Sequence, residues 1–144
     1  EALAAWMNRI DTWKAKKCLH YKVDAAKPIL PQAVIERVAA AAGENAYFST
    51  DVGEHQMWAA QYLKFREPRH WLTSGGLGTM GYGLPAALGV QVAHPDAVSV
   101  LFTGDGSIQM NIQELGTAKQ YGLHPKIFLL NNGYLGMVAL WQRA

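Results

Sequence analysis

The sequence has few cysteines, few charges and no long apolar run. Its single cysteine, Cys18, excludes a disulfide within the chain and is typical of a protein from a reducing compartment. Charged residues make up 17% of the chain, and a formal net charge of +2 does not indicate a nucleic-acid partner. No apolar run approaches the roughly 18 residues that span a bilayer, and the first residues lack the basic segment of a signal peptide. We therefore expect a cytoplasmic protein.

The 144 residues, half of them hydrophobic, are enough for one domain with a real core. Apolar periodicity and turn residues divide the chain into alternating strands and helices. Such alternation predicts an α/β fold, a parallel sheet covered by helices on both faces. The expected helices span residues 2–17, 31–42, 56–64, 80–93, about 111–121 and from about 135, and the expected strands 45–50, 70–73, 98–103 and 126–130. The first helix is amphipathic, with Leu3, Trp6, Ile10 and Trp13 on one side.

Two short polar motifs each follow one of the expected buried strands. Gly104-Asp105-Gly106 comes after strand 98–103, and Asn131-Asn132 comes after strand 126–130, with 24 residues between the motifs. A lone Gly-Asp-Gly is common and is usually only a turn. The spaced pair is more specific, because open α/β sheets bind ligands at the carboxyl ends of their strands. A carboxylate and an amide carbonyl are also hard oxygen ligands for a divalent metal.

A glycine-rich turn offers a competing interpretation as a dinucleotide site. Gly76, Gly78 and Gly81 match G-x-G-x-x-G between an expected strand and helix. That motif also needs an acidic residue at the end of the next strand, whereas Asp96 lies in the turn before that strand. We therefore disfavour NAD and interpret the glycines as a place where the backbone approaches another group closely.

Four blocks of sequence together resemble acetohydroxyacid synthase (acetolactate synthase), in the C-terminal diphosphate-binding domain of its catalytic large subunit. The resemblance covers nearly the whole chain from about residue 28, and it implies thiamine diphosphate (ThDP) and Mg²⁺ as cofactors. It divides the chain into a leading helix and linker over 1–27 and a ThDP-binding domain over 28–144. The matching blocks span residues 51–60, 74–87, 104–110 and 131–138, followed by Trp141-Gln142.

The resemblance also implies roles for residues around the metal and the diphosphate. Asp105 and Asn132 would ligate Mg²⁺ through their side chains, and Tyr134 through its backbone carbonyl. Gly106 and Ser107 would hold the diphosphate through backbone amides at a helix start, where the helix dipole favours an anion. Leu135, Gly136 and Met137 would close over the cofactor.

Two further segments take cofactor roles by the same resemblance. Glu54 and His55 match a loop near the diphosphate. Gly78 would offer its carbonyl to the aminopyrimidine, with Thr79 beside it, and Met80 would lie under the bent cofactor. Glu54 departs from the family, which often has glutamine there. Because a carboxylate would repel a diphosphate, we expect the Glu54 side chain to turn away or to pair with a cation.

Some of these residues also have ordinary structural interpretations. Met80 and Met137 fit as core methionines, and His55 as a loop histidine whose hydrogen bonds are satisfied. Trp141 resembles a tryptophan that lines the family's substrate channel, and it fits a core position on a helix face nearly as well. The other histidines show no metal-ligand spacing and are expected to be non-catalytic; they are His20, His70, His94 and His124.

The implied parent enzyme decarboxylates pyruvate and condenses it with pyruvate or 2-ketobutyrate, which leads to isoleucine and valine. No catalytic residue is expected in this chain, since the family supplies the activating glutamate from a partner subunit and carries FAD in another domain. We therefore expect an inactive, C-terminally truncated piece of a homo-oligomeric large subunit with a regulatory small subunit, from the cytoplasm or a eukaryotic plastid or mitochondrion. The alternatives are another ThDP enzyme, such as pyruvate oxidase or a 2-ketoacid decarboxylase, and a non-catalytic ThDP-binding module.

Overall fold

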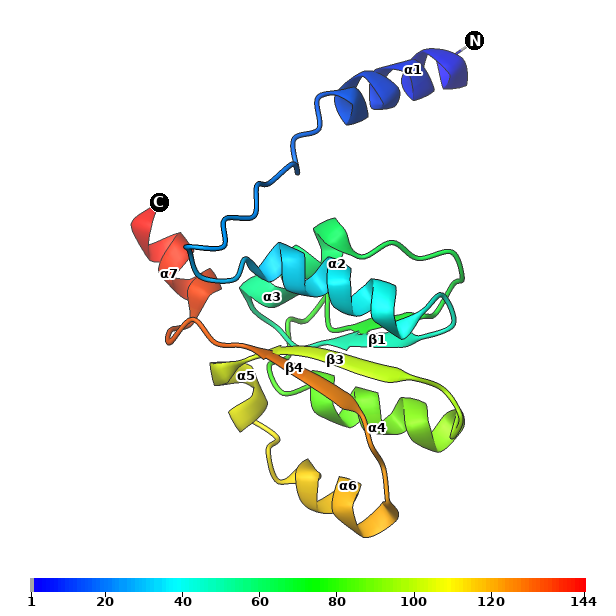
Figure 1. The fold of residues 1–144 in the computed structure, drawn as a ribbon, viewed down its shortest axis with the longest axis vertical. Coiled ribbons are helices and arrows are strands. Elements are labelled where there is room, and N and C mark those ends of the chain that lie inside the picture. Colours follow the sequence, from blue (N-terminus) through cyan, green and yellow to red (C-terminus); the bar gives the residue numbers. More distant parts are fainter. Residues whose placement is uncertain (1) are drawn as a thin grey trace.

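A parallel four-stranded sheet forms the centre of the molecule in the computed structural model, which describes residues 2–144 (Figure 1). The strands lie in the order β2-β1-β3-β4. Their bounds are β1 Tyr47–Thr50, β2 Trp71–Thr73, β3 Ser99–Gly104 and β4 Lys126–Leu130. This arrangement confirms the α/β fold expected from the sequence.

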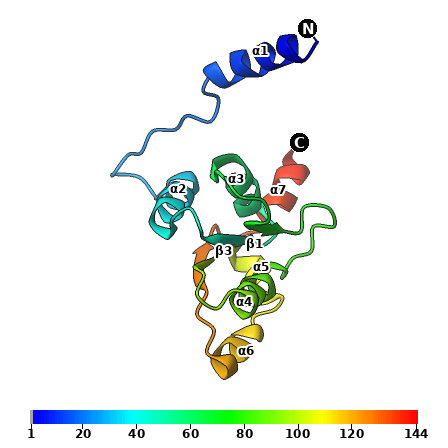
Figure 2. The same ribbon diagram turned by 90° about the vertical axis from the view of Figure 1, so that its right-hand side faces the viewer.

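Helices cover both faces of the sheet (Figure 2). Helices α2 (Pro31–Ala42) and α3 (Glu54–Tyr62) lie on one face, and α4 (Gly83–Ala93) and α6 (Glu114–Tyr121) lie on the other. Side chains of β3 alternate between the two layers, because successive residues of a strand point to opposite faces. Phe102 packs in the core under α2 and α3, whereas Leu101 packs against α4 and α6. All six residues of β3 are buried, and its three central residues, Val100, Leu101 and Phe102, are apolar, as expected for a strand covered on both faces.

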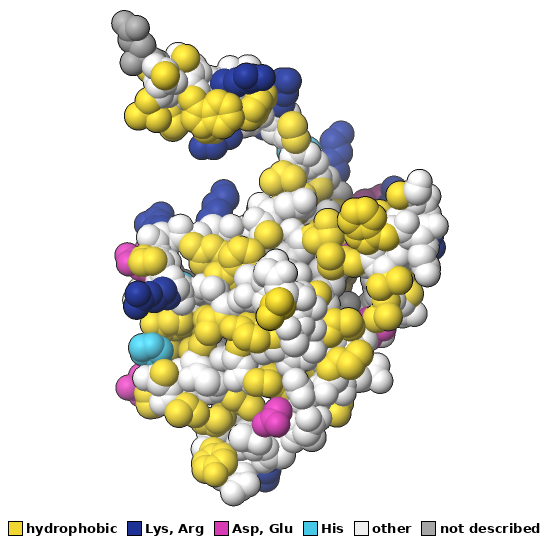
Figure 3. All heavy atoms as spheres, turned by 180° about the vertical axis from the view of Figure 1, so that it is seen from behind, with side chains coloured by type: hydrophobic (Ala, Val, Ile, Leu, Met, Phe, Trp, Pro, Cys, Tyr) yellow, Lys and Arg dark blue, Asp and Glu magenta, His cyan; other side chains and the backbone are white. Residues whose placement is uncertain are grey.

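Helix α1 (Ala2–Ala15) lies apart from this layered body (Figures 1 and 2). The predicted helix is present, but none of its described residues is buried. Leu3 is 73% exposed and Trp6 50% exposed. Trp6 and Trp13 contact each other edge to face, and Arg9 lies over the Trp13 ring. Figure 3 shows hydrophobic and basic side chains side by side on this helix.

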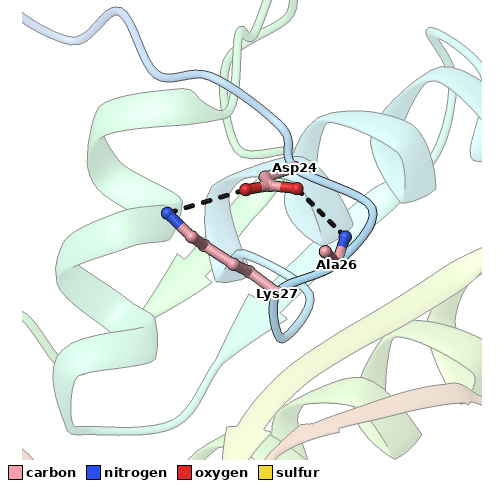
Figure 4. A network of polar contacts seen from close by, with 3 residues as sticks. All are labelled: Asp24, Ala26 and Lys27. Carbon is pink, nitrogen blue, oxygen red and sulfur yellow. Dashed lines mark hydrogen bonds and ion pairs between the residues drawn. The ribbon is translucent and has the colours of Figure 1, made fainter.

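The segment between α1 and α2 is irregular, and it includes one polar turn (Figure 4). The Asp24 carboxylate accepts a hydrogen bond from the Ala26 N–H at 3.0 Å and pairs with Lys27 at 3.6 Å. Both charged side chains are at least half exposed, so this ion pair adds little stability.

Three helices begin at different residues from those expected, and apolar periodicity did not reveal a fourth. Helix α3 begins at Glu54 instead of residue 56, α4 at Gly83 instead of residue 80, and α6 at Glu114 instead of about residue 111. The later start of α4 follows from Gly81, whose φ of +91° is incompatible with a right-handed helix. The helix that periodicity did not reveal is the short α5, Asp105–Gln109, where the resemblance implied a helix start. The last helix, α7, spans Gly136–Arg143. Among the described residues, no helix is both long and apolar enough to cross a membrane.

Candidate cofactor and metal site

The candidate site lies where the connections between strands diverge. From β1 the chain passes through α3 to β2 on one side, and it then returns through α4 to β3 on the other side of β1. The loops that follow β1 and β3 therefore separate and leave a crevice at the carboxyl ends of the strands. A small cavity of about 30 Å³ lies there, lined by residues of these two loops and of the loop after β4.

The expected metal ligands meet in this cavity. Asp105 follows β3 and Asn132 follows β4, and these neighbouring strands run in parallel with Gly104 paired to Leu130. Both side chains consequently line the same cavity, together with Tyr134. Residues 2–144 contain no group of three His, Cys, Asp or Glu that could hold a metal. The Asp105 carboxylate and the Asn132 amide nevertheless offer oxygen atoms of the kinds that Mg²⁺ accepts, and Mg²⁺ commonly completes its coordination with phosphate and water oxygens.

Glycines allow the loops to approach one another. A Cβ atom on Gly104 would lie 2.9 Å from Nδ1 of His55, and a Cβ on Gly53 would lie 2.7 Å from Cε1 of the same ring. A Cβ on Gly106 would lie 2.6 Å from Cδ2 of Leu135. Real Cβ atoms do not approach other atoms so closely, so a larger side chain at any of these positions would have to displace the side chain of His55 or Leu135.

Asp51 joins three segments of the site, and sequence reasoning gave it no role. It is fully buried, and its Oδ1 accepts hydrogen bonds from the Gly81 N–H at 2.7 Å and the Val52 N–H at 3.0 Å. Its Oδ2 accepts a hydrogen bond from the Thr103 hydroxyl at 3.3 Å. Asp51 thus ties the loop after β1 to the glycine-rich turn and to the end of β3. Its partners lie up to 52 residues away, and no local pattern indicates such distant contacts.

A further hydrogen bond joins the loop after β1 to the segment that follows β3. The Ser107 hydroxyl, in the first turn of α5, donates a hydrogen bond to the Val52 carbonyl at 2.6 Å. The amides at this helix start have no partner within the helix, as at any helix N-terminus. The bond therefore holds the start of α5, with its amides, against the loop after β1.

His55 is a buried histidine without a complete set of partners. It is only 5% exposed, and its Nε2 has no hydrogen-bond partner among the described residues. Burial lowers the pKa of His55 to about 4, although the Asp51 carboxylate, a hydrogen bond with the Asp51 backbone and the more distant Asp105 favour the protonated form. The ring is therefore neutral at pH 7. Its unpartnered nitrogen in a cavity wall is suited to a polar atom of a ligand.

This lowered pKa makes stability depend on pH. Between about pH 6.5 and pH 4 the unfolded chain binds a proton at His55 that the folded chain does not bind. We expect the free energy of unfolding of the metal-free protein to fall as the pH drops through this window. Urea unfolding at several pH values tests this, with His55→Gln expected to show a shallower slope. The exposed His20→Gln should keep the wild-type slope, and equal slopes in all three proteins would contradict the assignment.

The structure brings most of the expected site residues together. The cavity is lined by Glu54, His55, Met80, Asp105, Gly106, Ser107, Asn132, Tyr134, Leu135 and Gly136. Gly78, Thr79 and Met137 do not line it, and Trp141 is 77% exposed on α7. Trp141 is therefore not the core aromatic that one interpretation suggested. Met80 lies near Gly106, where a Cβ would come within 3.8 Å of its Cε. Other residues that line the cavity were not expected: Val52, Gly53, Trp58, Gly104 and Leu130.

Comparison with known proteins gives a consistent result. Residues 51–144 match the family described as thiamine pyrophosphate enzyme, C-terminal TPP binding domain, thiamine pyrophosphate (TPP) being another name for ThDP. The chain is 56% identical over 140 residues to an acetolactate synthase large subunit of Haemophilus influenzae, which covers 97% of this chain and 24% of that protein. It is 56% identical over 137 residues to the acetolactate synthase isozyme 3 large subunit of Escherichia coli, covering 95% and 24%. A large subunit from Cyanidium caldarium is 52% identical over 140 residues, covering 97% and 23%. The chain thus spans about a quarter of the length of these relatives.

Proposed function

The chain belongs to the thiamine pyrophosphate enzyme family, whose C-terminal TPP-binding domain it carries, and on this premise we propose that it holds ThDP and Mg²⁺ in an acetolactate synthase large subunit. The observation that carries the proposal is the meeting of Asp105 and Asn132 in one cavity at the ends of neighbouring parallel strands. Carboxylate, amide and backbone carbonyl oxygens are the ligand types that Mg²⁺ prefers.

The residues present fit a metal-bound diphosphate. Gly106 lies in the first turn of α5 and has no side chain to keep a ligand from its amide, and Nε2 of His55 has no hydrogen-bond partner among the described residues. In our proposal Asp105, Asn132 and the Tyr134 carbonyl hold the metal, while Gly106 and Ser107 hold the diphosphate. A cavity of about 30 Å³ has room for little more than water, so the loops around it would have to open to admit a diphosphate.

Bound ThDP would supply the electron sink for decarboxylation of a 2-ketoacid. The chain's own part is to anchor the cofactor. Asp51 holds the glycine-rich turn in place, from which Gly78, Thr79 and Met80 would contact the ring end of the cofactor. Neutral His55 would donate or accept a hydrogen bond without adding charge near the diphosphate. Trp141, exposed on α7, would face the substrate channel of the longer enzyme.

For the whole protein we propose the reaction that the relatives' names indicate, which is synthesis of acetolactate. It would decarboxylate pyruvate and join the product to pyruvate or 2-ketobutyrate, on the route to valine and isoleucine. FAD, the activating glutamate, the partner subunits of a homo-oligomer and a regulatory small subunit all lie outside this chain in our proposal. The cytoplasm, or a plastid or mitochondrion in a eukaryote, is the proposed location.

An activity measurement tests this proposal. With saturating ThDP and Mg²⁺ we expect the 144-residue chain alone to form no acetolactate from pyruvate, because it provides only the anchoring face of the cofactor site. We expect a longer protein that contains this chain and has the full length of its relatives to form acetolactate. Acetolactate from the chain alone, above a protein-free control, would contradict the first part. Acetaldehyde or acetate as the main product of the longer protein would favour a decarboxylase or an oxidase instead.

A further inference from the structure

Glu54 has an unusual place in the candidate site. It is the first residue of α3, and its carboxylate accepts a hydrogen bond from the Asn132 side-chain N–H₂ at 2.9 Å. The same carboxylate packs against Gly136, where a Cβ atom would overlap it. From the sequence we expected this side chain to turn away from the site or to pair with a cation. It does neither. It binds a neutral amide inside the cavity wall.

This bond, together with a second one, fixes the orientation of the Asn132 amide. While its nitrogen donates to Glu54, its oxygen accepts a hydrogen bond from the Tyr134 N–H at 3.3 Å. An amide can in principle be rotated by half a turn, which exchanges its oxygen and its nitrogen. Here that rotation would place oxygen against the carboxylate and N–H₂ against the backbone N–H. A carboxylate only accepts hydrogen bonds, so Glu54 admits one orientation alone.

The charge of Glu54 has a second effect. Glu54 and Asp105 both line the cavity, and no Lys or Arg is among the described residues that do so. Neither of the two ion pairs formed within residues 2–144 includes Glu54. An approaching diphosphate therefore meets two carboxylates, and among residues 2–144 no cationic side chain lines the cavity to offset them, so a bound metal would supply the positive charge. Like charges in one small, partly buried cavity repel each other more strongly than they would in water.

We propose that Glu54 is a positioning residue with two linked effects: it keeps the Asn132 oxygen available to the metal, and it makes ThDP binding depend on that metal. The inference rests on the proposed function, since it concerns the same metal and cofactor. A role of Glu54 in helix stability alone would have different consequences. An acidic residue in the first turn of a helix stabilises it modestly, and that effect would change thermal unfolding but not the coupling between metal and cofactor.

The test uses Glu54→Gln in the intact protein, with ThDP binding followed by tryptophan fluorescence, since Trp58 lines the cavity. In excess EDTA we expect the variant to bind ThDP about threefold more tightly than wild type, because one repelling charge is gone. At saturating ThDP we expect it to need about tenfold more Mg²⁺ for half-saturation, as for loss of an outer-shell partner of a metal ligand. The two shifts have opposite signs: the variant should bind ThDP more tightly without metal, and it should bind Mg²⁺ more weakly in the presence of ThDP.

Two further variants make the result specific. Asn132→Ala removes the group that Glu54 positions, so adding Glu54→Gln to it should not raise the Mg²⁺ requirement again. Glu67→Gln removes an equal charge from an exposed position outside the cavity and should match wild type in both titrations.

The outcomes separate this inference from the function on which it rests. Opposite shifts in Glu54→Gln, with the second absent in the Asn132→Ala background, would support it. Unchanged binding, or shifts of the same sign with and without metal, would overturn it while Mg²⁺-dependent binding by wild type still upheld the proposed function. If wild type itself bound no ThDP with Mg²⁺, the proposed function would fail, and the inference with it.

Discussion

Asp105→Ala should weaken Mg²⁺-dependent binding of ThDP by more than about 100-fold, beyond the range typical of outer-shell partners of a metal. Asp105 lines the cavity directly after β3 and is the proposed anionic metal ligand. The other carboxylate there, Glu54, is already engaged with Asn132 and cannot replace it without breaking that bond. Calorimetric titration with ThDP at fixed Mg²⁺ measures the effect.

Two variants serve as comparisons for Asp105→Ala. Asn132→Ala should cause a smaller loss, because it removes a neutral ligand and water can fill the vacancy. Asp11→Ala removes an exposed carboxylate from α1 and should bind like wild type. Wild-type affinity in Asp105→Ala would remove the basis for the metal assignment.

Asp51→Ala should lower the free energy of unfolding by about 3 kcal/mol, in the range for leaving buried hydrogen-bonding groups without their charged partner. The substitution leaves the N–H groups of Gly81 and Val52 and the hydroxyl of Thr103 without their shared acceptor. It should also weaken ThDP binding, because the glycine-rich turn is no longer tied to the loop after β1. Urea unfolding followed by circular dichroism measures the stability change.

Matched substitutions show whether burial and hydrogen bonding cause that loss. Asp51→Asn keeps one acceptor oxygen and should cost less than Asp51→Ala. Asp96→Ala changes an exposed aspartate and should stay within about 0.5 kcal/mol of wild type. A loss for Asp51→Ala no larger than that for Asp96→Ala would contradict the role given to this carboxylate.

The strands and most helices could be predicted from the sequence, because local patterns determine them. The run 126–130 is β4 as predicted, and Pro31 and Gly43 mark the two ends of α2. Periodicity did not reveal helix α5, because only five residues form it, although the resemblance implied a helix start at Gly106 and Ser107. The sequence predicted the amphipathic pattern of α1, but a pattern cannot show which surface, if any, its apolar side contacts.

In the candidate site, too, features that depend on neighbouring residues in the sequence could be predicted, whereas features that depend on distant residues could not. Asp105 and Asn132 could be paired from the sequence because each directly follows a strand, and the parallel sheet then brings strand ends together. The role of Asp51 could not be predicted, since it depends on Gly81 and Thr103 from distant parts of the chain. The predicted direction of the Glu54 side chain was wrong, because the prediction considered its repulsion of a diphosphate but not its hydrogen bond with the Asn132 amide.

The most direct test of the central claim is anomalous X-ray diffraction from crystals of the intact protein grown with ThDP and Mn²⁺ in place of Mg²⁺. We predict one strong anomalous peak at about 2 Å from a carboxylate oxygen of Asp105, the side-chain oxygen of Asn132 and the backbone carbonyl of Tyr134. The remaining contacts of the ion should be diphosphate oxygens and water. A peak elsewhere, or bound ThDP without a metal between its diphosphate and Asp105, would contradict the account.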